Sequence, residues 1–146
     1  MKRTYLDANI LLEAFLGKDG AWVRAMEVLD DPERSLVVSD YLRLEVLPKP
    51  IFHNRRQEVE FMQTILENAS ERVSTSPALT GRAVDLAGRY DMSPLDALHV
   101  SAAVEAGVDE LVTLEKSSKP MCRVTEVKVI SLHSPPAPNA GPRPVP

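Results

Sequence analysis

The sequence predicts an α/β fold, in which helices cover both faces of a central, mostly parallel sheet. Two short runs, at residues 35–38 and 111–114, are rich in valine and leucine and have the composition of buried parallel strands. Around them lie segments whose apolar residues recur at the three-to-four-residue spacing of a helix. Strands that alternate with helices are typical of parallel sheets, because parallel neighbours need a crossover between them.

The first half of the chain is expected to run in the order strand, helix, helix, strand, helix. These elements cover residues 4–6, 8–16, about 21–29, 35–38 and 41–46. Gly17 ends the first helix, because glycine readily adopts the left-handed conformation of a C-cap. Ser39 or Asp40 caps the third helix, a common use of both residue types. Pro48 and Pro50 stop it, because proline lacks the amide hydrogen that a helix interior needs.

The second half is expected to run helix, edge strand, helix, helix, strand, strand. These elements cover residues 57–69, 71–75, 80–90, 94–106, 111–114 and 127–132. Gly107 follows the fourth of them as a helix C-cap. Residues 134–146 differ from the rest, since six of these thirteen residues are proline. We therefore expect one domain over residues 1–133 and a flexible, polyproline-like tail after it.

Composition limits the class of protein. The chain has 146 residues, enough for one domain, and its formal net charge of −4 argues against a generally basic nucleic-acid coat protein. A single cysteine, Cys122, excludes an internal disulfide and a cysteine-based zinc site. Asp7, Asn9 and Glu13 interrupt the apolar run that a signal peptide needs, and no segment has the ~20 apolar residues of a membrane span. We expect a soluble, cytoplasmic protein that does not contact a membrane.

Four acidic residues lie where an apolar segment meets a turn or a helix start: Asp7, Glu45, Asp96 and Glu115. Asp7 and Asp96 could be helix caps and Glu115 a solvated turn residue, whereas Glu45 sits in mid-helix beside apolar residues. Removing a carboxylate from water costs several kcal/mol in order of magnitude. A shared hard cation, Mg²⁺ or Mn²⁺, would neutralise all four. The set favours a metal-dependent phosphodiester enzyme.

Four short motifs surround these acids: YLDANILL at 5–12, VSDYLRLE at 38–45, SPLDALHVSAA at 93–103 and LVTLE at 111–115. Together, and in this order, they resemble the PIN-domain family of metal-dependent ribonucleases, in particular the small bacterial toxins of the VapC type. The resemblance spans about residues 3–132 and implies a PIN-like three-layer α/β/α fold. One position departs from the family, because Glu115 stands where an aspartate is usual and its side chain is one methylene longer.

The resemblance also implies a site and a reaction. Asp7, Glu45 and Asp96 would hold Mg²⁺ or Mn²⁺, with Glu115 as the fourth acid that positions a water, and the reaction would be endonucleolytic cleavage of RNA phosphodiester bonds. Residues expected to support the acids through hydrogen bonds are Asn9, Ser39 and Thr113. His99 follows Asp96 by three residues, and we expect it on the helix surface or the core edge rather than in the site.

Partners follow from the same resemblance and from local charge. Basic residues after the second and fourth acids are expected to contact RNA phosphates: Lys49, Arg55, Arg56 and Lys116. A VapC-type toxin would also bind a cognate antitoxin protein and form a homodimer. The alternative is a catalytically degenerate PIN-like module that binds RNA or a protein, motivated by Glu115. A phosphoaspartyl hydrolase is disfavoured, because it needs a second aspartate where Asn9 stands.

Overall fold

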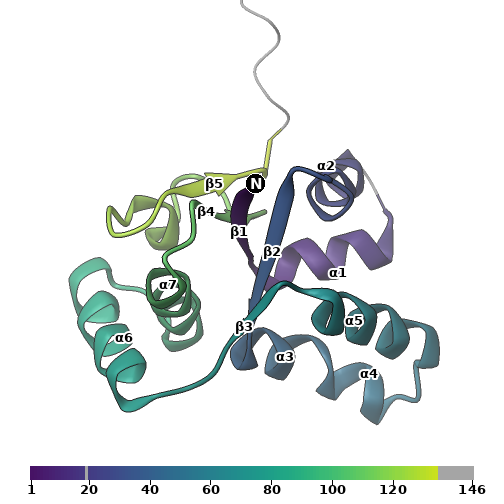
Figure 1. Cartoon of the computed structure of the whole chain (residues 1–146), viewed down its shortest axis with the longest axis horizontal. Coiled ribbons are helices and arrows are strands. Elements are labelled where there is room, and N and C mark those ends of the chain that lie inside the picture. Colours follow the sequence, from purple (N-terminus) through teal and green to yellow (C-terminus); the bar gives the residue numbers. More distant parts are fainter. Residues whose placement is uncertain (19, 135–146) are drawn as a thin grey trace, which may run out of the picture.

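The computed structural model of the chain describes residues 1–18 and 20–134, and its centre is a five-stranded sheet with the order β3-β2-β1-β4-β5 (Figure 1). The strands are β1 (Lys2–Leu6), β2 (Arg34–Ser39), β3 (Glu71–Val73), β4 (Glu110–Thr113) and β5 (Val129–Ser131). All four strand pairings are parallel. The predicted α/β fold with a parallel sheet is therefore confirmed, including the position of β3 at an edge.

Seven α-helices and one short 3₁₀ helix connect the described strands. They are α1 (Ala8–Leu16), α2 (Gly20–Leu29), α3 (Asp40–Val46), α4 (Pro48–Phe52), α5 (Arg56–Asn68), α6 (Pro77–Tyr90), α7 (Pro94–Ala106) and η1 (Pro120–Arg123). Gly17 and Gly107 end α1 and α7 in the left-handed conformation, as predicted. Helix α3 ends at Val46, before Pro48, as predicted. Pro48 then begins a separate short helix, α4, which the sequence did not predict, because proline is tolerated in the first turn, where amides lack intrahelical partners.

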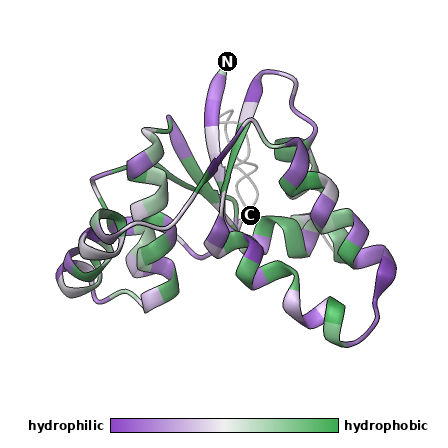
Figure 2. Ribbon diagram, turned by 60° about the horizontal axis from the view of Figure 1, so that its bottom comes forward, coloured by the Kyte–Doolittle hydropathy of each residue, from purple (hydrophilic) through white to green (hydrophobic). Residues whose placement is uncertain are grey.

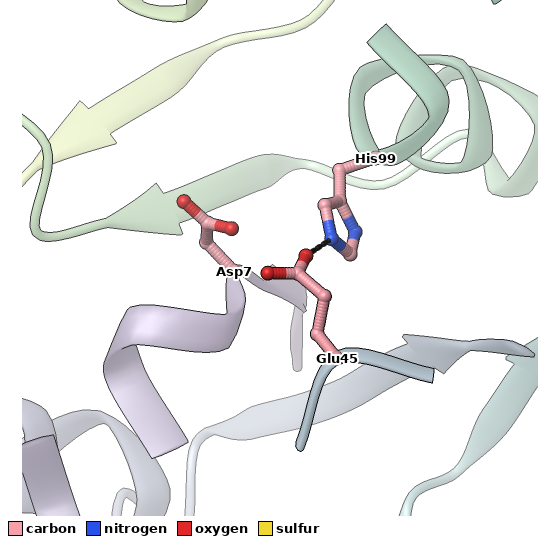
Figure 3. Close-up of side chains that lie close together, drawn as sticks. All are labelled: Asp7, Glu45 and His99. Atoms are coloured by element: carbon pink, nitrogen blue, oxygen red, sulfur yellow. Dashed lines mark hydrogen bonds and ion pairs between the residues drawn. The ribbon is translucent and has the colours of Figure 1, made fainter. Parts of the chain in front are cut away.

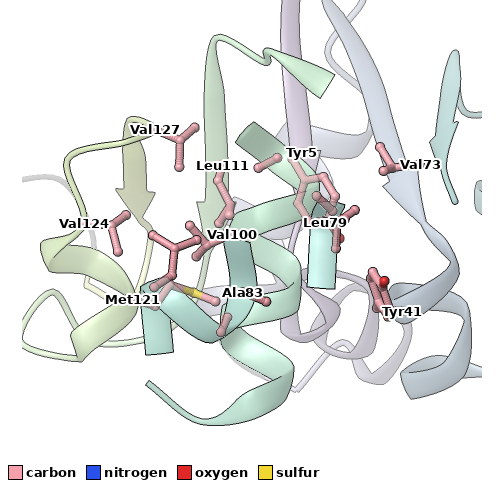
Figure 4. Packing of buried hydrophobic residues seen from close by; sticks show 14 of the residues in the cluster. Tyr5, Tyr41, Val73, Leu79, Ala83, Val100, Leu111, Met121, Val124 and Val127 are labelled. Atoms are coloured by element: carbon pink, nitrogen blue, oxygen red, sulfur yellow. The ribbon is translucent and has the colours of Figure 1, made fainter. Parts of the chain in front are cut away.

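Alternate strand residues supply two separate cores, one on each face of the sheet. Tyr5 belongs to the cluster under α6 and α7, shown in Figure 4, whereas its neighbour Leu6 belongs to the cluster under α1, α2 and α5. Val37 and Val38 divide between the two faces in the same way. Figure 2 shows that the covering helices carry both hydrophobic and hydrophilic residues, as expected for helices with one buried side. The result is the predicted three-layer α/β/α arrangement.

The parallel register brings the carboxyl ends of the central strands to one edge of the sheet. Leu6 of β1 is aligned with Val112 of β4, and Tyr5 is aligned with Val37 of β2. Helices α1 and α3 start directly after β1 and β2, so their first residues lie at this edge. In open parallel sheets, ligand sites form beyond the carboxyl ends of the strands. The fold thus places the segments that carry the first two predicted acids on the same edge.

Two predictions concern regions outside this core. The proline-rich segment from residue 135 onward lies outside the described residues, and the domain boundary at about 133 stays a prediction. Across residues 1–18 and 20–134, none of the helices has both the length and the apolar character that crossing a membrane requires.

Candidate metal centre

Asp7 is the first residue after β1 and is a buried carboxylate held by uncharged donors. It caps α1, and its Oδ1 accepts a hydrogen bond from the amide of Ala8 at 2.8 Å. Its Oδ2 accepts one from the hydroxyl of Thr113 at 2.6 Å. Only 5% of the residue is exposed, and no lysine or arginine of the described residues forms an ion pair with it. The Asp7 carboxylate that caps α1 is therefore also able to serve as a metal ligand.

Burial raises the pKa of Asp7 above its ordinary value, and the nearby charge of Asp96 raises it further. His99 and the hydrogen bonds from Thr113 and Ala8 lower this pKa, but the net direction is upward. The ionised form of Asp7 is thus penalised by its surroundings in the protein alone. A divalent cation beside it would reverse that penalty, because it favours the charged carboxylate.

Glu45 and His99 approach Asp7 from two different helices. Glu45 is half-buried on α3, and His99 on α7 is fully buried. The Nε2 of His99 is hydrogen-bonded to Oε1 of Glu45, and one potential ligand atom from each of the three residues lies within 4.8 Å of the others (Figure 3). Oxygen ligands surround Mg²⁺ at about 2.1 Å, so ligand atoms around one ion are separated by roughly 3–4 Å. The corner is of the right size for one divalent ion.

The position of His99 corrects the prediction for this residue. We expected it on the helix surface or at the core edge, but it is buried and faces Glu45. Its spacing of three residues from Asp96 places both on one side of α7. That spacing was the available signal, but α7 is apolar on several sides, so the sequence did not identify the face that meets the site.

Behind His99 lies a second hydrogen-bonded pair, Tyr5 and Ser39. The Tyr5 hydroxyl is 2.7 Å from Nδ1 of His99 and 2.5 Å from Oγ of Ser39. Ser39 also caps α3, because its Oγ accepts a hydrogen bond from the amide of Leu42 at 3.2 Å. Burial raises the pKa of Tyr5 far above its usual range, so this phenol keeps its proton. Nothing in the sequence indicated this role for Tyr5, because its partners His99 and Ser39 are distant in the chain.

Thr113 bonds to Asp7 directly, and Asn9 acts through Thr113. The Nδ2 of Asn9 donates to Oγ1 of Thr113 at 3.2 Å, and its Oδ1 accepts from the amide of Leu114 at 3.0 Å. Thr113 in turn donates to Asp7. These bonds tie the start of α1 to the end of β4 and hold the Asp7 carboxylate in one orientation. Ser39, also expected to support an acid, bonds instead to Tyr5 and to the amide of Leu42.

Asp96 lies close to this corner but outside the group of three. It is near the start of α7, where its amide donates to the capping Oγ of Ser93 at 3.3 Å. Its half-buried carboxylate makes no hydrogen bond within the described part of the chain, and its charge acts on Asp7. Asp96 is therefore placed at the edge of the candidate centre with free carboxylate oxygens.

Glu115 follows β4 and lies on another side of the same corner. It lines a hollow of about 440 Å³ together with Asn9, Arg24 and His133. Burial raises the pKa of Cys122, and the charges of Glu115, Asp7 and Asp96 raise it further. Of the four predicted acids, only Asp7 and Glu45 belong to the tight group. That Asp96 and Glu115 act on the same ion stays a prediction.

The four basic residues expected to contact RNA are exposed, and they divide between two parts of the molecule. Lys49 lies on α4, and Arg55 and Arg56 lie at the start of α5. Lys116 lies in the turn after β4. In Figure 1, α4 and α5 are on the opposite side of the sheet from α6 and α7. Arg55 forms an ion pair with Glu58 at 3.7 Å, so part of its charge is already balanced.

The parallel sheet, with the buried Asp7 and the half-buried Glu45 beyond its carboxyl edge, defines an α/β protein with a candidate divalent-cation centre. Residues 4–124 match the PIN domain. This match covers most of the chain, and the protein therefore belongs to the PIN-domain family. A search of curated proteins finds no significant match.

Several solved structures share the fold. A toxin–antitoxin complex from Klebsiella pneumoniae aligns with a TM-score of 0.69 and 20% identity, over 88% of this chain and 96% of that chain. VapBC2 from Rickettsia felis, bound to a DNA fragment from its promoter, aligns at 0.60 and 16%, over 88% and 98%. FitAcB from Neisseria gonorrhoeae aligns at 0.55 and 18%, over 88% and 96%. At these identities the likeness supports the fold.

Proposed function

We propose that this protein is a metal-dependent endoribonuclease of the VapC type, the toxin of a type II toxin–antitoxin pair that acts in the cytoplasm. The observation that carries the proposal is Asp7, a buried carboxylate without a lysine or arginine partner among the described residues, beside Glu45 and close to Asp96. Membership of the PIN-domain family supports nuclease chemistry at this place.

The residues present fit a Mg²⁺ or Mn²⁺ ion. Asp7 and Glu45 would hold it directly, Asp96 would complete the inner set, and Glu115 would act from the outer side through its longer arm. When bound, the ion supplies Lewis acidity for the attacking water and balances charge on the scissile phosphate. The protein's own contribution is to orient the carboxylates, through Thr113 at Asp7 and through His99 at Glu45.

RNA would be held mainly through its phosphates. The exposed residues Lys49, Arg55, Arg56 and Lys116 offer cationic side chains on the two parts of the molecule that follow Glu45 and Glu115. Such contacts position a nucleic acid without reading its sequence. The net charge of −4 means that attraction to RNA depends on these local groups and weakens as salt rises.

Protein partners are supported by exposed apolar side chains on two regions. On α3 and α4, Leu44, Ile51 and Phe52 are exposed, and Trp22 and Val23 are exposed on α2. Clustered exposed apolar residues mark sites of protein association. We assign these regions to an antitoxin and to a second copy of the chain, in keeping with the toxin–antitoxin complex from Klebsiella pneumoniae that shares the fold.

Cleavage of a 5′-labelled RNA pool of random sequence tests the proposal. The purified protein should fragment the pool with Mg²⁺ or Mn²⁺, lose this activity in EDTA, and regain it with excess Mn²⁺. Asp7→Asn should be inactive, whereas Glu110→Gln, which removes a carboxylate at the opposite edge of the sheet, should remain active when assayed below its melting temperature. Activity in EDTA, or in Asp7→Asn, would refute the metal mechanism. Retention of RNA without cleavage would favour the degenerate binding module.

A further inference from the structure

His99 is a buried imidazole whose two ring nitrogens are both used inside the protein. Its side chain has no exposed surface. Nε2 meets Oε1 of Glu45, and Nδ1 meets the hydroxyl of Tyr5. A fully enclosed imidazole beside a candidate metal ligand has two alternative roles. It can bind the ion itself, or it can hold the carboxylate that does.

The proton count distinguishes these roles. Oγ of Ser39 accepts from the amide of Leu42, so its own hydrogen can be donated to Tyr5, the other hydrogen-bond partner of this oxygen. Tyr5 then donates to Nδ1 of His99, which leaves the imidazole proton on Nε2, facing Glu45. In this arrangement Nε2 donates to Oε1 of Glu45, and both ring nitrogens are engaged within the protein.

A protonated Nε2 has no lone pair to offer a metal ion. Nδ1 cannot replace it, because Tyr5 covers that nitrogen at 2.7 Å on the side away from Glu45. The geometry leaves His99 one function at this site, which is to donate a hydrogen bond to Glu45. Since Tyr5 belongs to β1, Ser39 caps α3 and His99 lies on α7, this chain of bonds also fixes three elements relative to one another.

We propose that His99 is a positioning residue that holds the Glu45 carboxylate in its metal-binding orientation, backed by Tyr5 and Ser39, and is not itself a metal ligand. The inference rests on the proposed function, in that Glu45 is taken as a ligand. Groups that orient metal ligands typically contribute about 10- to 100-fold to metal affinity. Loss of the His99 donor should therefore weaken cation binding by a factor in this range.

Two variants of His99 test which of its ring nitrogens supports Glu45. In His99→Gln the amide reaches the place of Nε2 and can still donate to Glu45, whereas in His99→Asn it reaches only the place of Nδ1. Mn²⁺ affinity, measured by the electron paramagnetic resonance signal of free Mn²⁺ with no RNA present, should fall about 10- to 100-fold in His99→Asn. It should stay within a few fold of the parent in His99→Gln. Equal affinity in all three proteins, or equal loss in both variants, would overturn the inference.

A measurement on the unsubstituted protein keeps the inference testable if a variant does not fold. Nitrogen couplings in the pulsed resonance spectrum of bound Mn²⁺ would show an imidazole ligand, and their presence would overturn the inference. In the metal-free protein, the ¹⁵N chemical shifts assigned to His99 should show a hydrogen on Nε2; its absence would also overturn the inference. If the parent binds Mn²⁺ but does not cut RNA, the ribonuclease proposal fails while these results still decide the role of His99.

Discussion

The two edges of the sheet each bury a carboxylate, but only one of these charges is balanced by the protein. At the amino edge, Glu110 is 3% exposed and accepts hydrogen bonds from Arg34 at 3.0 Å and from the hydroxyl of Thr4 at 2.7 Å, with Lys2 at 3.7 Å. At the carboxyl edge, Asp7 is 5% exposed and accepts only from a hydroxyl and an amide. The two carboxylates are thus buried to a similar extent, but basic side chains balance the charge of Glu110 and not that of Asp7.

This difference separates a structural acid from a functional one. Glu110 has its cations built into the fold, so its charge is compensated as soon as the chain is folded. Asp7 keeps a raised pKa and has further acids around it, which is unfavourable for stability. A site that accumulates negative charge without an internal lysine or arginine is suited to recruit a cation from solution, as the proposed metal centre requires.

The largest expected effect is on stability, when each carboxylate is replaced by its amide. Glu110→Gln should lower the free energy of unfolding by about 2–3 kcal/mol, because Arg34 loses its partner; the partial exposure of Arg34 keeps this below the cost of breaking a fully buried pair. Asp7→Asn should leave the metal-free protein unchanged or more stable, since Asn caps a helix about as well as Asp. Urea denaturation in EDTA measures both values. A larger loss of unfolding free energy in Asp7→Asn than in Glu110→Gln would contradict the proposed difference between the two edges.

A smaller effect is expected in the pH dependence of the metal-free protein. Because the pKa of Asp7 is raised in the folded state, the folded chain keeps a proton that the unfolded chain has already lost. Stability from this group is therefore full below its ordinary pKa of 3.8 and falls as pH rises through the folded-state pKa. The stability gain of Asp7→Asn over the parent should grow from about pH 4 upward, by about 1.4 kcal/mol for each unit of pKa difference. A gain that does not change with pH would show that Asp7 ionises normally.

The smallest effect is expected at Cys122, which reports on the acidic edge. Its thiol pKa is raised by burial and by the charges of Glu115, Asp7 and Asp96, so its reaction with iodoacetamide near neutral pH should be slow. A bound divalent cation would offset these charges and lower the pKa, and each half unit would increase the rate about threefold. Glu110→Gln should react like the parent. An alkylation rate that does not change with Mg²⁺ would argue that no cation binds near these acids.

The two edges also differ in how well the sequence predicted them. Strands and helices were predictable from apolar periodicity and from caps such as Gly17 and Gly107, and Asp7 from its place directly after a strand. His99 was misplaced, because an apolar helix such as α7 does not reveal which side meets a site. The hydroxyl of Tyr5 and the pairing of Glu110 with Arg34 depend on contacts between residues distant in sequence, which no local pattern encodes.

Mn²⁺ binding to three proteins tests the proposed metal centre most directly: the parent, Asp7→Asn and Glu110→Gln. The two variants remove the same charge from opposite edges of the sheet. Isothermal titration below the melting temperature of each protein should show affinity reduced tenfold or more in Asp7→Asn and retained in Glu110→Gln. Equal affinity of the parent and Asp7→Asn, or an equal loss in both variants, would contradict the claim that the carboxyl edge is a metal centre.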